Sequence, residues 1–572
     1  MPSPKSRTTN WQTVISHPLL WIAIAFLPAA FIFANRVLVP DMSTDVISYH
    51  LFNGLRGLSH PLTPFLPTEF YPVGIANIPS GLDSVNTVVR LVLGYRLGTI
   101  LSLFSMVVIA IMLYKILSLV LTENKRNFNA FWGLLLVNSL IVLELYFQLA
   151  TYFIDNLNSA LLLILLYSCL RLVYRKSLPT SWLVGLYLAL GVTISLKLTN
   201  IPFALPMVAI LAWHSLKDIK KPSVSTGIKK LVLVVLVAIP ILPLWIANYN
   251  ASSNPVFPFY NKVFHSPYYP AVSYTDTTFG GRNLPERLLW PISSLRDQLR
   301  LGEPHHIYND YKLVICWLVG LVLLALYARR KITLSQQEVL VVAYFMVSLF
   351  LWGLLFGINR YATSSIALGG IVVAIAVLHI SPSSRKTSSK AALVLIVLVL
   401  CALLVEDVRI IKFNTKYDMS WRPTLTANKA LHRTQLHHLF DKQITVSEEQ
   451  AAIIDQADIM LNCHTNVSGL LALLPKTKDK PVVNIISDGL PQYRAMSTNR
   501  QYNLEVGKHL GLPSRKLNWV SVVSDKDIGP TTSECLTNIR TKGGKVIRQQ
   551  QLDSFLGYSG PRLYIISGTI RL

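Results

Sequence analysis

The stretch LLWIAIAFLPAAFIFANRVLV at 19–39 decides the fold class of this chain. Its only charged residue is Arg36, near the end, and a helix of this length covers the roughly 30 Å hydrocarbon layer of a bilayer. Lipid offers the backbone no hydrogen-bonding partner, so a crossing segment has to be helical. The apolar run is longer than the core of a signal peptide, which predicts an uncleaved membrane anchor.

Similar apolar runs recur through the first 406 residues. The chain has 572 residues, of which 52% are hydrophobic and only 14% charged, and its mean hydropathy is +0.44. These values exclude an ordinary soluble fold. We expect an α-helical polytopic membrane protein with about eleven spans, near 19–39, 97–121, 130–149, 157–174, 181–196, 201–215, 230–249, 312–328, 338–357, 361–380 and 390–406.

Basic residues in the short connections predict the orientation. They cluster in alternate connections, on the side of the N-terminus: Lys125 and Arg126, Arg175 and Lys176, 217–230, 329–331 and 385–390. The positive-inside rule makes that side cytoplasmic. With an odd number of crossings, residues 40–90, 250–310 and 407–572 lie outside. The absence of organelle retention signals favours the inner membrane of a bacterial envelope.

The formal net charge of +24 has a simple explanation in this topology. Cytoplasmic lysines and arginines carry the orientation signal and attract anionic lipid headgroups. We therefore expect membrane lipids as partners and no nucleic acid.

Two long external loops and a C-terminal region complete the predicted organisation. The loops at 40–90 and 250–310 are rich in proline and aromatic residues, which favours ordered, substrate-facing structure. Residues 1–406 would form the membrane domain, and residues 417–572 have the composition of a soluble domain. Segments such as DIML, PVVNII, NWVSVV and LYIISGTI predict short buried strands, and 447–457, 501–510 and 530–542 predict helices. This pattern is typical of a small α/β domain, and we interpret it as an accessory domain that binds an acceptor or a partner.

Cysteines give little information. Cys463 and Cys535 are the two in the external domain, where an oxidising compartment would permit a disulfide. No C-x-x-C or H-E-x-x-H spacing occurs in the sequence.

Candidate chemistry begins just beyond the first span. Asp41 and Asp45 are four residues apart, so a helical exit from the membrane would place both carboxylates on one face, near Tyr49 and His50. Alternatively, Asp41 caps a short interfacial helix and Asp45 is solvated.

Further polar residues stand at predicted outer helix ends. They are Asp155 at the start of the fourth span, Lys197 and Asn200 after the fifth, and Arg360 and Tyr361 before the tenth. Ionisable groups at membrane depth usually mark a substrate path, although Lys197 and Arg360 could instead snorkel to headgroups. Carboxylates and cations at one interface suit a lipid phosphate substrate together with a general base.

Five segments in this order resemble the GT-C superfamily of membrane glycosyltransferases, in particular the bacterial branch related to protein mannosyltransferases and aminoarabinose transferases. They are DVISYHL at 45–51, TYFIDN at 151–156, SLKLTN at 195–200, NYNASSNPVFPFYN at 248–261 and NRYA at 359–362. The resemblance covers residues 15–380 and leaves the C-terminal domain uncovered.

The resemblance implies a polyprenyl-phosphate-sugar donor, and a glycan, lipid or protein acceptor at the outer face. It makes Asp45 the general base and Asp41 the second choice. Lys197 and Arg360 would clamp the phosphate, with Tyr49, His50, Asp155, Asn200 and Tyr361 as further substrate-binding residues. A divalent metal cation could also supply positive charge for the departing phosphate.

Three other functions stay open at the level of sequence. In a non-catalytic scaffold, the clustering of ionisable groups at one face would be accidental. An O-antigen ligase or polymerase type of enzyme would use the late loop, with Arg282, Arg287, His305 and His306. A transporter or flippase for lipid-linked glycans would be expected to show repeated hydropathy and broken helices with buried ions at mid-membrane, and the sequence shows neither.

Overall fold

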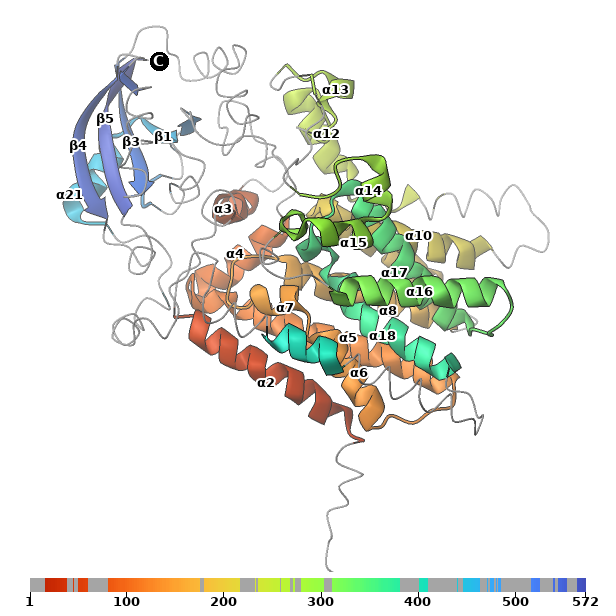
Figure 1. Cartoon of the computed structure of the whole chain (residues 1–572). Coiled ribbons are helices and arrows are strands. Elements are labelled where there is room, and N and C mark those ends of the chain that lie inside the picture. Colours follow the sequence, from red (N-terminus) through yellow and green to blue (C-terminus); the bar gives the residue numbers. More distant parts are fainter. Residues whose placement is uncertain are drawn as a thin grey trace, which may run out of the picture.

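The computed structural model describes a helical bundle and a small C-terminal sheet (Figure 1). The residues that it describes are 16–38, 45, 50–59, 81–174, 179–216, 232, 235–257, 259–267, 271–272, 279–302, 311–380, 401–409, 440, 446–462, 471, 474–477, 480, 482–484, 516–524, 539–540, 544–552 and 563–571.

Six helices in the described ranges are long and apolar enough to cross a membrane. In chain order they are α2 (Pro18–Arg36), Leu97–Glu123, which contains α5 (Ile100–Glu123), α8 (Asp155–Tyr174), α16 (Tyr311–Ala328), α17 (Gln336–Leu355) and Asn359–His379, most of which belongs to α18 (Thr363–Ile380). The expected polytopic helical fold is confirmed.

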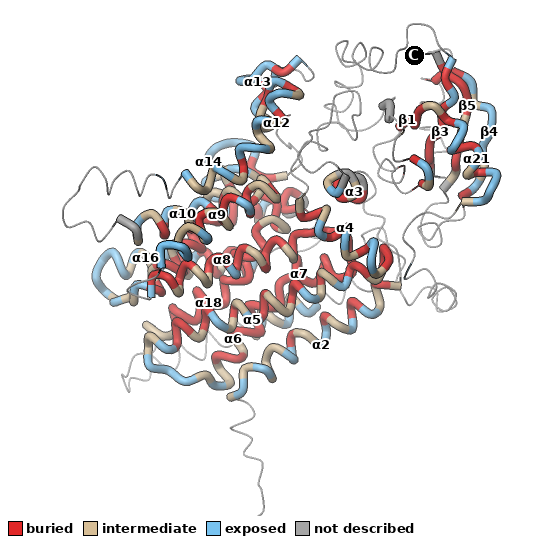
Figure 2. The backbone as a smooth tube through the Cα atoms, turned by 180° about the vertical axis from the view of Figure 1, so that it is seen from behind, coloured by how far each residue is buried: buried red, intermediate tan, exposed pale blue. Residues whose placement is uncertain are grey.

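The buried fraction of the membrane helices increases from the edge of this bundle to its centre. Of the apolar window of α2 only 22% is buried inside the protein, whereas the window around α18 is 89% buried. Figure 2 shows α18 as a mostly red tube among its neighbours, with α2 at the margin. A helix that is apolar all round can occupy either position, because lipid tails and the protein interior are both apolar.

Three shorter apolar helices cover other predicted spans, and one of those predictions is wrong in its outer part. The helices are α6 (Ala130–Leu140), α9 (Thr180–Leu196) and α10 (Ile201–Leu216). The span expected at 130–149 is not one helix: α6 ends at Leu140, Ile141 and Val142 leave the helical conformation, and α7 (Leu143–Phe147) follows. Side chains from other elements satisfy the carbonyls that this break frees, as described below.

Two predicted spans lie partly outside the described residues. In the span expected at 230–249, residues 236–241 form turns and α12 (Leu242–Ser252) begins only afterwards. Pro240 and Pro243 lack the amide donor that a helix interior requires, so an unbroken helix there is a wrong prediction. Of the span expected at 390–406, residues 401–406 are described, within the helix at 401–409.

Short helices form the described parts of the two loops that the sequence analysis predicted at 40–90 and 250–310. After α2 come α3 (Leu51–Ser59) and α4 (Gly81–Leu93), and the later loop contains α13 (Asn261–Phe264), α14 (Leu284–Leu288) and α15 (Trp290–Ser293). Helices α3 and α4 pack at close range, since a Cβ on Gly54 would lie 1.9 Å from Oγ1 of Thr87. Both external loops are therefore partly helical.

The C-terminal domain contains a mixed five-stranded sheet of order β2-β1-β3-β5-β4. Its strands are β1 (Ile459–Asn462), β2 (Val482–Asn484), β3 (Lys516–Ser524), β4 (Lys545–Leu552) and β5 (Leu563–Arg571). Strand β1 pairs in parallel with β2 and β3, and β5 pairs antiparallel with β3 and β4. The expected strands and the helix α21 (Glu448–Gln456) are present. The sequence did not predict β4, because KVIRQQQL has few apolar residues.

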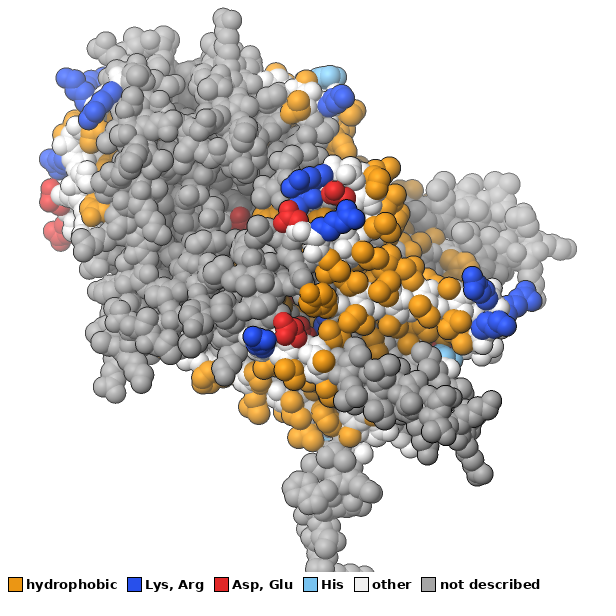
Figure 3. Space-filling model, in the orientation of Figure 1, with side chains coloured by type: hydrophobic (Ala, Val, Ile, Leu, Met, Phe, Trp, Pro, Cys, Tyr) orange, Lys and Arg blue, Asp and Glu red, His pale blue; other side chains and the backbone are white. Residues whose placement is uncertain are grey.

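Charged side chains gather at separate places on the face of the bundle shown in Figure 3, and two of these groups belong to elements described above. One group lies over α14 and includes Arg282, Glu286 and Asp297. The other lies at the connection between α16 and α17, where residues 329–331 are exposed. A largely apolar surface separates the two groups, as expected for a bundle surrounded by lipid.

Candidate functional site

The first ion pair of the candidate site joins the chain after α2 to the start of α18. The short helix η7 (Asn359–Ala362) places Arg360 directly before the start of α18. Nη2 of Arg360 donates a hydrogen bond to Oδ2 of Asp45 at 2.6 Å, and 31% of the Asp45 side chain remains exposed. Residues 315 positions apart in the sequence are therefore partners.

The second ion pair joins the ends of α8 and α9. Asp155 is the first residue of α8, where a carboxylate interacts favourably with the helix dipole. Lys197 ends α9 in an extended conformation, and its Nζ donates to Oδ1 of Asp155. The side chains are 11% and 3% exposed, respectively, so Lys197 does not snorkel into the headgroups. It is held by a buried carboxylate.

Two aromatic rings connect the ion pairs. The guanidinium of Arg360 lies 4.7 Å from the centre of the Phe153 ring and 5.4 Å from that of Tyr361. The Lys197 ammonium lies 4.8 Å from the same Tyr361 ring. Both cations thus share Tyr361, and cations bound over aromatic faces are attracted by the ring quadrupole. The structure brings together Asp45, Asp155 and their two cationic partners.

His50 joins this group through Phe153. Its ring meets the Phe153 ring edge-on, with the centres 5.9 Å apart, and its Nδ1 lies 2.7 Å from Oδ1 of Asp83 on α4. Both side chains are buried, at 8% and 6% exposure. Asp83 therefore orients the imidazole, and the sequence analysis missed this role because the two residues are 33 positions apart.

Asn200 is part of the framework beside the site. It exchanges side-chain hydrogen bonds with Asn158 of α8 at 2.6 and 2.7 Å, and its Nδ2 also reaches the carbonyl of Thr193 at 2.7 Å. These bonds fix the short helix η4 (Leu198–Asn200) against α8. The amide thus holds Lys197 and Asp155 in register, and in this structure it is engaged with the protein.

Two tryptophans hold the turn that presents Arg360, and the sequence analysis missed both. The indole N–H of Trp290 donates to the carbonyl of Gly357, and that of Trp352 donates to the carbonyl of Ile358, each at 2.8 Å. Gly357 has φ of +70°, and a Cβ there would lie 2.5 Å from the Cα of Gly280. Only glycine accommodates this backbone conformation and this close approach.

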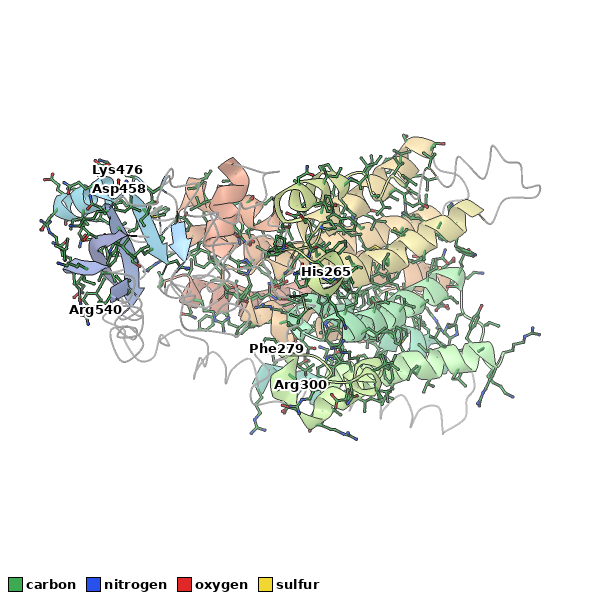
Figure 4. All side chains as sticks on the ribbon, turned by 90° about the horizontal axis from the view of Figure 1, so that it is seen from above. His265, Phe279, Arg300, Asp458, Lys476 and Arg540 are labelled. Carbon is green, nitrogen blue, oxygen red and sulfur yellow. The ribbon has the colours of Figure 1, made fainter. Side chains whose placement is uncertain are left out.

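Arginines of the late loop bind their own loop. Arg300 Nη1 lies 3.0 Å from Glu286, Arg282 pairs with Asp297 at 3.6 Å, and Nε of Arg287 donates to Gly281 at 2.9 Å. Figure 4 shows Arg300 near Phe279, beside these short helices. The backbone amide of Arg282 and the side chain of Arg300 hold the pKa of the Glu286 carboxyl below its usual range. Hydrogen bonds to the ionised form cause this shift.

Several of the predicted site residues lie outside the residues that the structure describes. Asp41, Tyr49, His305, His306, Cys463 and Cys535 lie outside the described residues. Among the residues that are described, no three His, Cys, Asp or Glu side chains gather as metal ligands would. In the described structure Asp45 and Asp155 each pair with a cationic side chain.

Comparison with known proteins yields structural neighbours. No protein-family model matches the sequence, and no curated protein matches it significantly. Two crystal structures of ArnT from Cupriavidus metallidurans are similar to this chain. The apo structure aligns with a TM-score of 0.45 and the structure bound to undecaprenyl phosphate with 0.47. In both cases the identity is 12%, over 96% of this chain and 97% of the other.

Proposed function

We propose that this chain is a membrane glycosyltransferase that moves a sugar from a polyprenyl-phosphate donor to an acceptor at the outer face of the membrane. The observation that carries the proposal is the meeting of two carboxylate–cation pairs, Asp45–Arg360 and Asp155–Lys197, at the aromatic rings of Phe153 and Tyr361. Such a set provides both a base and positive charge in one place.

The cations suit the phosphate of the donor. A guanidinium and an ammonium that share one tyrosine ring can bind two oxygens of a single phosphate group. In the described structure the carboxylates take the place of those oxygens. Phosphate binding therefore competes with Asp45 for Arg360, and Asp45 becomes a stronger base when the guanidinium turns to the phosphate.

The reaction then balances as a displacement at the anomeric carbon. An acceptor hydroxyl oxygen forms the new bond to this carbon while the bond to the phosphate oxygen breaks. The bonding electrons leave with the phosphate, where Lys197 and Arg360 stabilise the developing charge. The hydroxyl proton passes to Asp45, the partly exposed carboxylate of the group.

Two features support this function over the ligase-type alternative. The described arginines of the late loop, Arg282 and Arg287, bind groups of their own loop. The cations at the converging helix ends instead pair with carboxylates and stack on aromatic rings, which is the arrangement that a phosphate and a hydroxyl nucleophile require.

The test is transfer by the purified full-length protein. It would be incubated with a panel of radiolabelled polyprenyl-phosphate sugars and a membrane extract as the source of acceptor, with the Asp45→Asn protein as matched control. Label is expected to move from one donor to an acceptor in the wild type and not in the variant. Movement of intact donor between the leaflets of proteoliposomes, without sugar transfer, would instead support a flippase.

A further inference from the structure

An ammonium group at the outer end of α16 binds the broken end of α6. Lys312 is the second residue of α16 and its side chain is only 4% exposed. Its Nζ donates to the carbonyls of Asn138 and Ile141, the latter at 2.6 Å, and to Oδ2 of Asp407 at 3.0 Å. Three N–H donors thus meet three acceptors, which satisfies the ammonium completely.

The carbonyls that Lys312 binds exist as acceptors because α6 stops early. The last carbonyls of a helix have no partner within it, and here they lie in a region where lipid or protein excludes water. A cation is also favoured at this negative end of the helix dipole. Without Lys312, the carbonyls of Asn138 and Ile141 would lose the ammonium donor that they share at the break between α6 and α7.

The segment that follows the break leads directly to the candidate site. It contains α7, an irregular stretch through Phe153, and Asp155 at the start of α8. As at the break, a side chain from another helix satisfies this backbone: Arg36 of α2 donates to the carbonyls of Tyr146 and Phe147 at 2.9 Å. Irregular backbone at membrane depth is tolerated only where such partners satisfy it.

Asp407 adds a connection to the C-terminal part of the chain. It lies in the helix at 401–409, the last helix of the described residues before α21 of the C-terminal region. Asp407 of this helix therefore accepts a hydrogen bond from Lys312 of α16, beside the start of segment 141–155.

We propose that the Lys312–Asp407 pair is a lock that positions segment 141–155 for transfer, with Lys312 as a positioning residue that does not touch substrate. The lock also ties this segment to the helix that leads to the C-terminal domain. The inference rests on the proposed transferase function for its kinetic consequence, whereas its structural consequence is measured without any substrate.

The structural experiment is hydrogen–deuterium exchange on the full-length protein in nanodiscs. Lys312→Met keeps the length of the side chain but removes all three donors, and we expect faster exchange in peptides from 141–155 with α17 unchanged. Lys115→Met is the matched control, since that lysine also lies in a span but faces the Tyr167 ring at 5.5 Å. Unchanged exchange in 141–155 of the Lys312→Met protein would overturn the lock.

Kinetics separate positioning from general stability. Displacement of reacting groups by about 1 Å costs on the order of 10²-fold in rate, so turnover per folded Lys312→Met molecule should fall by that order. Lys312→Arg keeps donors and charge, and should stay within about tenfold of the wild type. Loss in Lys312→Met with no rescue by Lys312→Arg would assign Lys312 a role that requires its amine, and would overturn the lock.

A milder variant covers the case in which Lys312→Met does not fold. Asp407→Asn keeps an oxygen acceptor and removes only the charge, so it should raise exchange in 141–155 less than Lys312→Met does. No change in exchange for Asp407→Asn would overturn the connection to the last helix. If the wild-type protein transfers no sugar, the proposed function fails, while the exchange data still decide whether the lock exists.

Discussion

At the scale of single residues, the site consists of charges that neutralise one another. Asp45 with Arg360 is partly exposed, and Asp155 with Lys197 is buried. A carboxylate in contact with solvent can exchange its proton after each turnover, whereas a buried pair is costly to break, by about 3–5 kcal/mol. For the proposed transfer this difference favours Asp45 as the base, with Asp155 holding Lys197.

The first prediction concerns Asp45→Asn. Asparagine has nearly the same shape and can accept a hydrogen bond from Arg360, but it cannot take a proton. We expect turnover to fall by about 10²- to 10⁴-fold, the usual contribution of a general base, with donor affinity retained. Single-turnover kinetics and a donor-binding assay would measure the two quantities. Near-normal transfer by Asp45→Asn, Asp41→Asn and the double variant would exclude both carboxylates as the base.

The second prediction concerns Arg360→Gln. Its partner Asp45 is exposed enough to be solvated, so the variant should fold, and the loss of a charge-assisted hydrogen bond should cost about 1.5–3 kcal/mol of donor binding. This corresponds to a roughly 10- to 100-fold higher Kd. Arg329→Gln, at the opposite charged group of the bundle, should bind donor as the wild type does. If Arg360→Gln and Arg329→Gln both bound donor with wild-type affinity, Arg360 would not bind the donor phosphate, and contact with lipid headgroups would be its role instead.

At the scale of elements, the turn before α18 depends on neighbours that are distant in sequence. Trp290 comes from α15 and Trp352 from α17, and each donates to one carbonyl of the turn. The short helices of the late loop thus buttress Arg360. A loop that was expected to face the substrate contributes, in the described part, by holding a cation in position.

Trp290→Phe tests this buttress. Phenylalanine fills most of the indole volume but leaves the buried Gly357 carbonyl without its donor, which should destabilise the protein by about 1–3 kcal/mol and weaken donor binding several-fold. Trp182→Phe is the control: Trp182 is 66% exposed, and its replacement should stay within about 0.5 kcal/mol. Thermal unfolding and a donor-binding assay would compare the two variants. Equal changes in stability and in donor affinity would contradict a role of Trp290 in holding Arg360.

The pH dependence of the late loop follows from Glu286. Its pKa is lowered in the folded protein, so its contribution to loop stability is fully present above the unfolded value of about 4.3 and is lost as the pH falls through the lower folded value. Limited proteolysis at the loop should accelerate in this acidic window. The Glu286→Gln protein should lack that acid-dependent step, and an identical acid profile for the two proteins would contradict the prediction.

At the scale of the whole molecule, the described charged groups mark two ends of an apolar bundle. The group over α14 and the candidate site lie at the ends where α2 finishes and α16 and α18 begin, whereas residues 329–331 lie where α16 has ended. The C-terminal sheet lies near α3 and α4 in both Figure 1 and Figure 2. We therefore propose that the sheet and the site share the outer compartment.

The orientation has a direct test. Alkaline phosphatase fused after residue 572 is active only outside the cytoplasm, so this fusion should be active in bacterial cells. A cytoplasmic reporter at the same position should be silent. A fusion in the connection at 329–331 should give the opposite result and serves as the internal control. Reversed activities would overturn the orientation and place the site on the wrong side of the membrane.

The sequence by itself determined what depends on local composition. Apolar length predicts helices because a backbone in lipid has to satisfy its own hydrogen bonds, and this reasoning gave the long spans. Short apolar runs predicted β1, β2, β3 and β5 of the C-terminal domain. It also singled out Asp45, Asp155, Lys197 and Arg360, because a charge at a helix end in membrane is costly and needs a reason.

Only the tertiary structure decided which of these charges are partners and what holds them. Hydropathy predicted one span at 130–149, because a broken helix and a straight helix made of the same apolar residues have the same hydropathy. The break is stable because Lys312 arrives from α16 to bind its carbonyls. Likewise, Asp83 meets His50 and Trp290 meets Gly357 through packing between distant elements. Such contacts depend on three-dimensional proximity, which no local pattern in the sequence encodes.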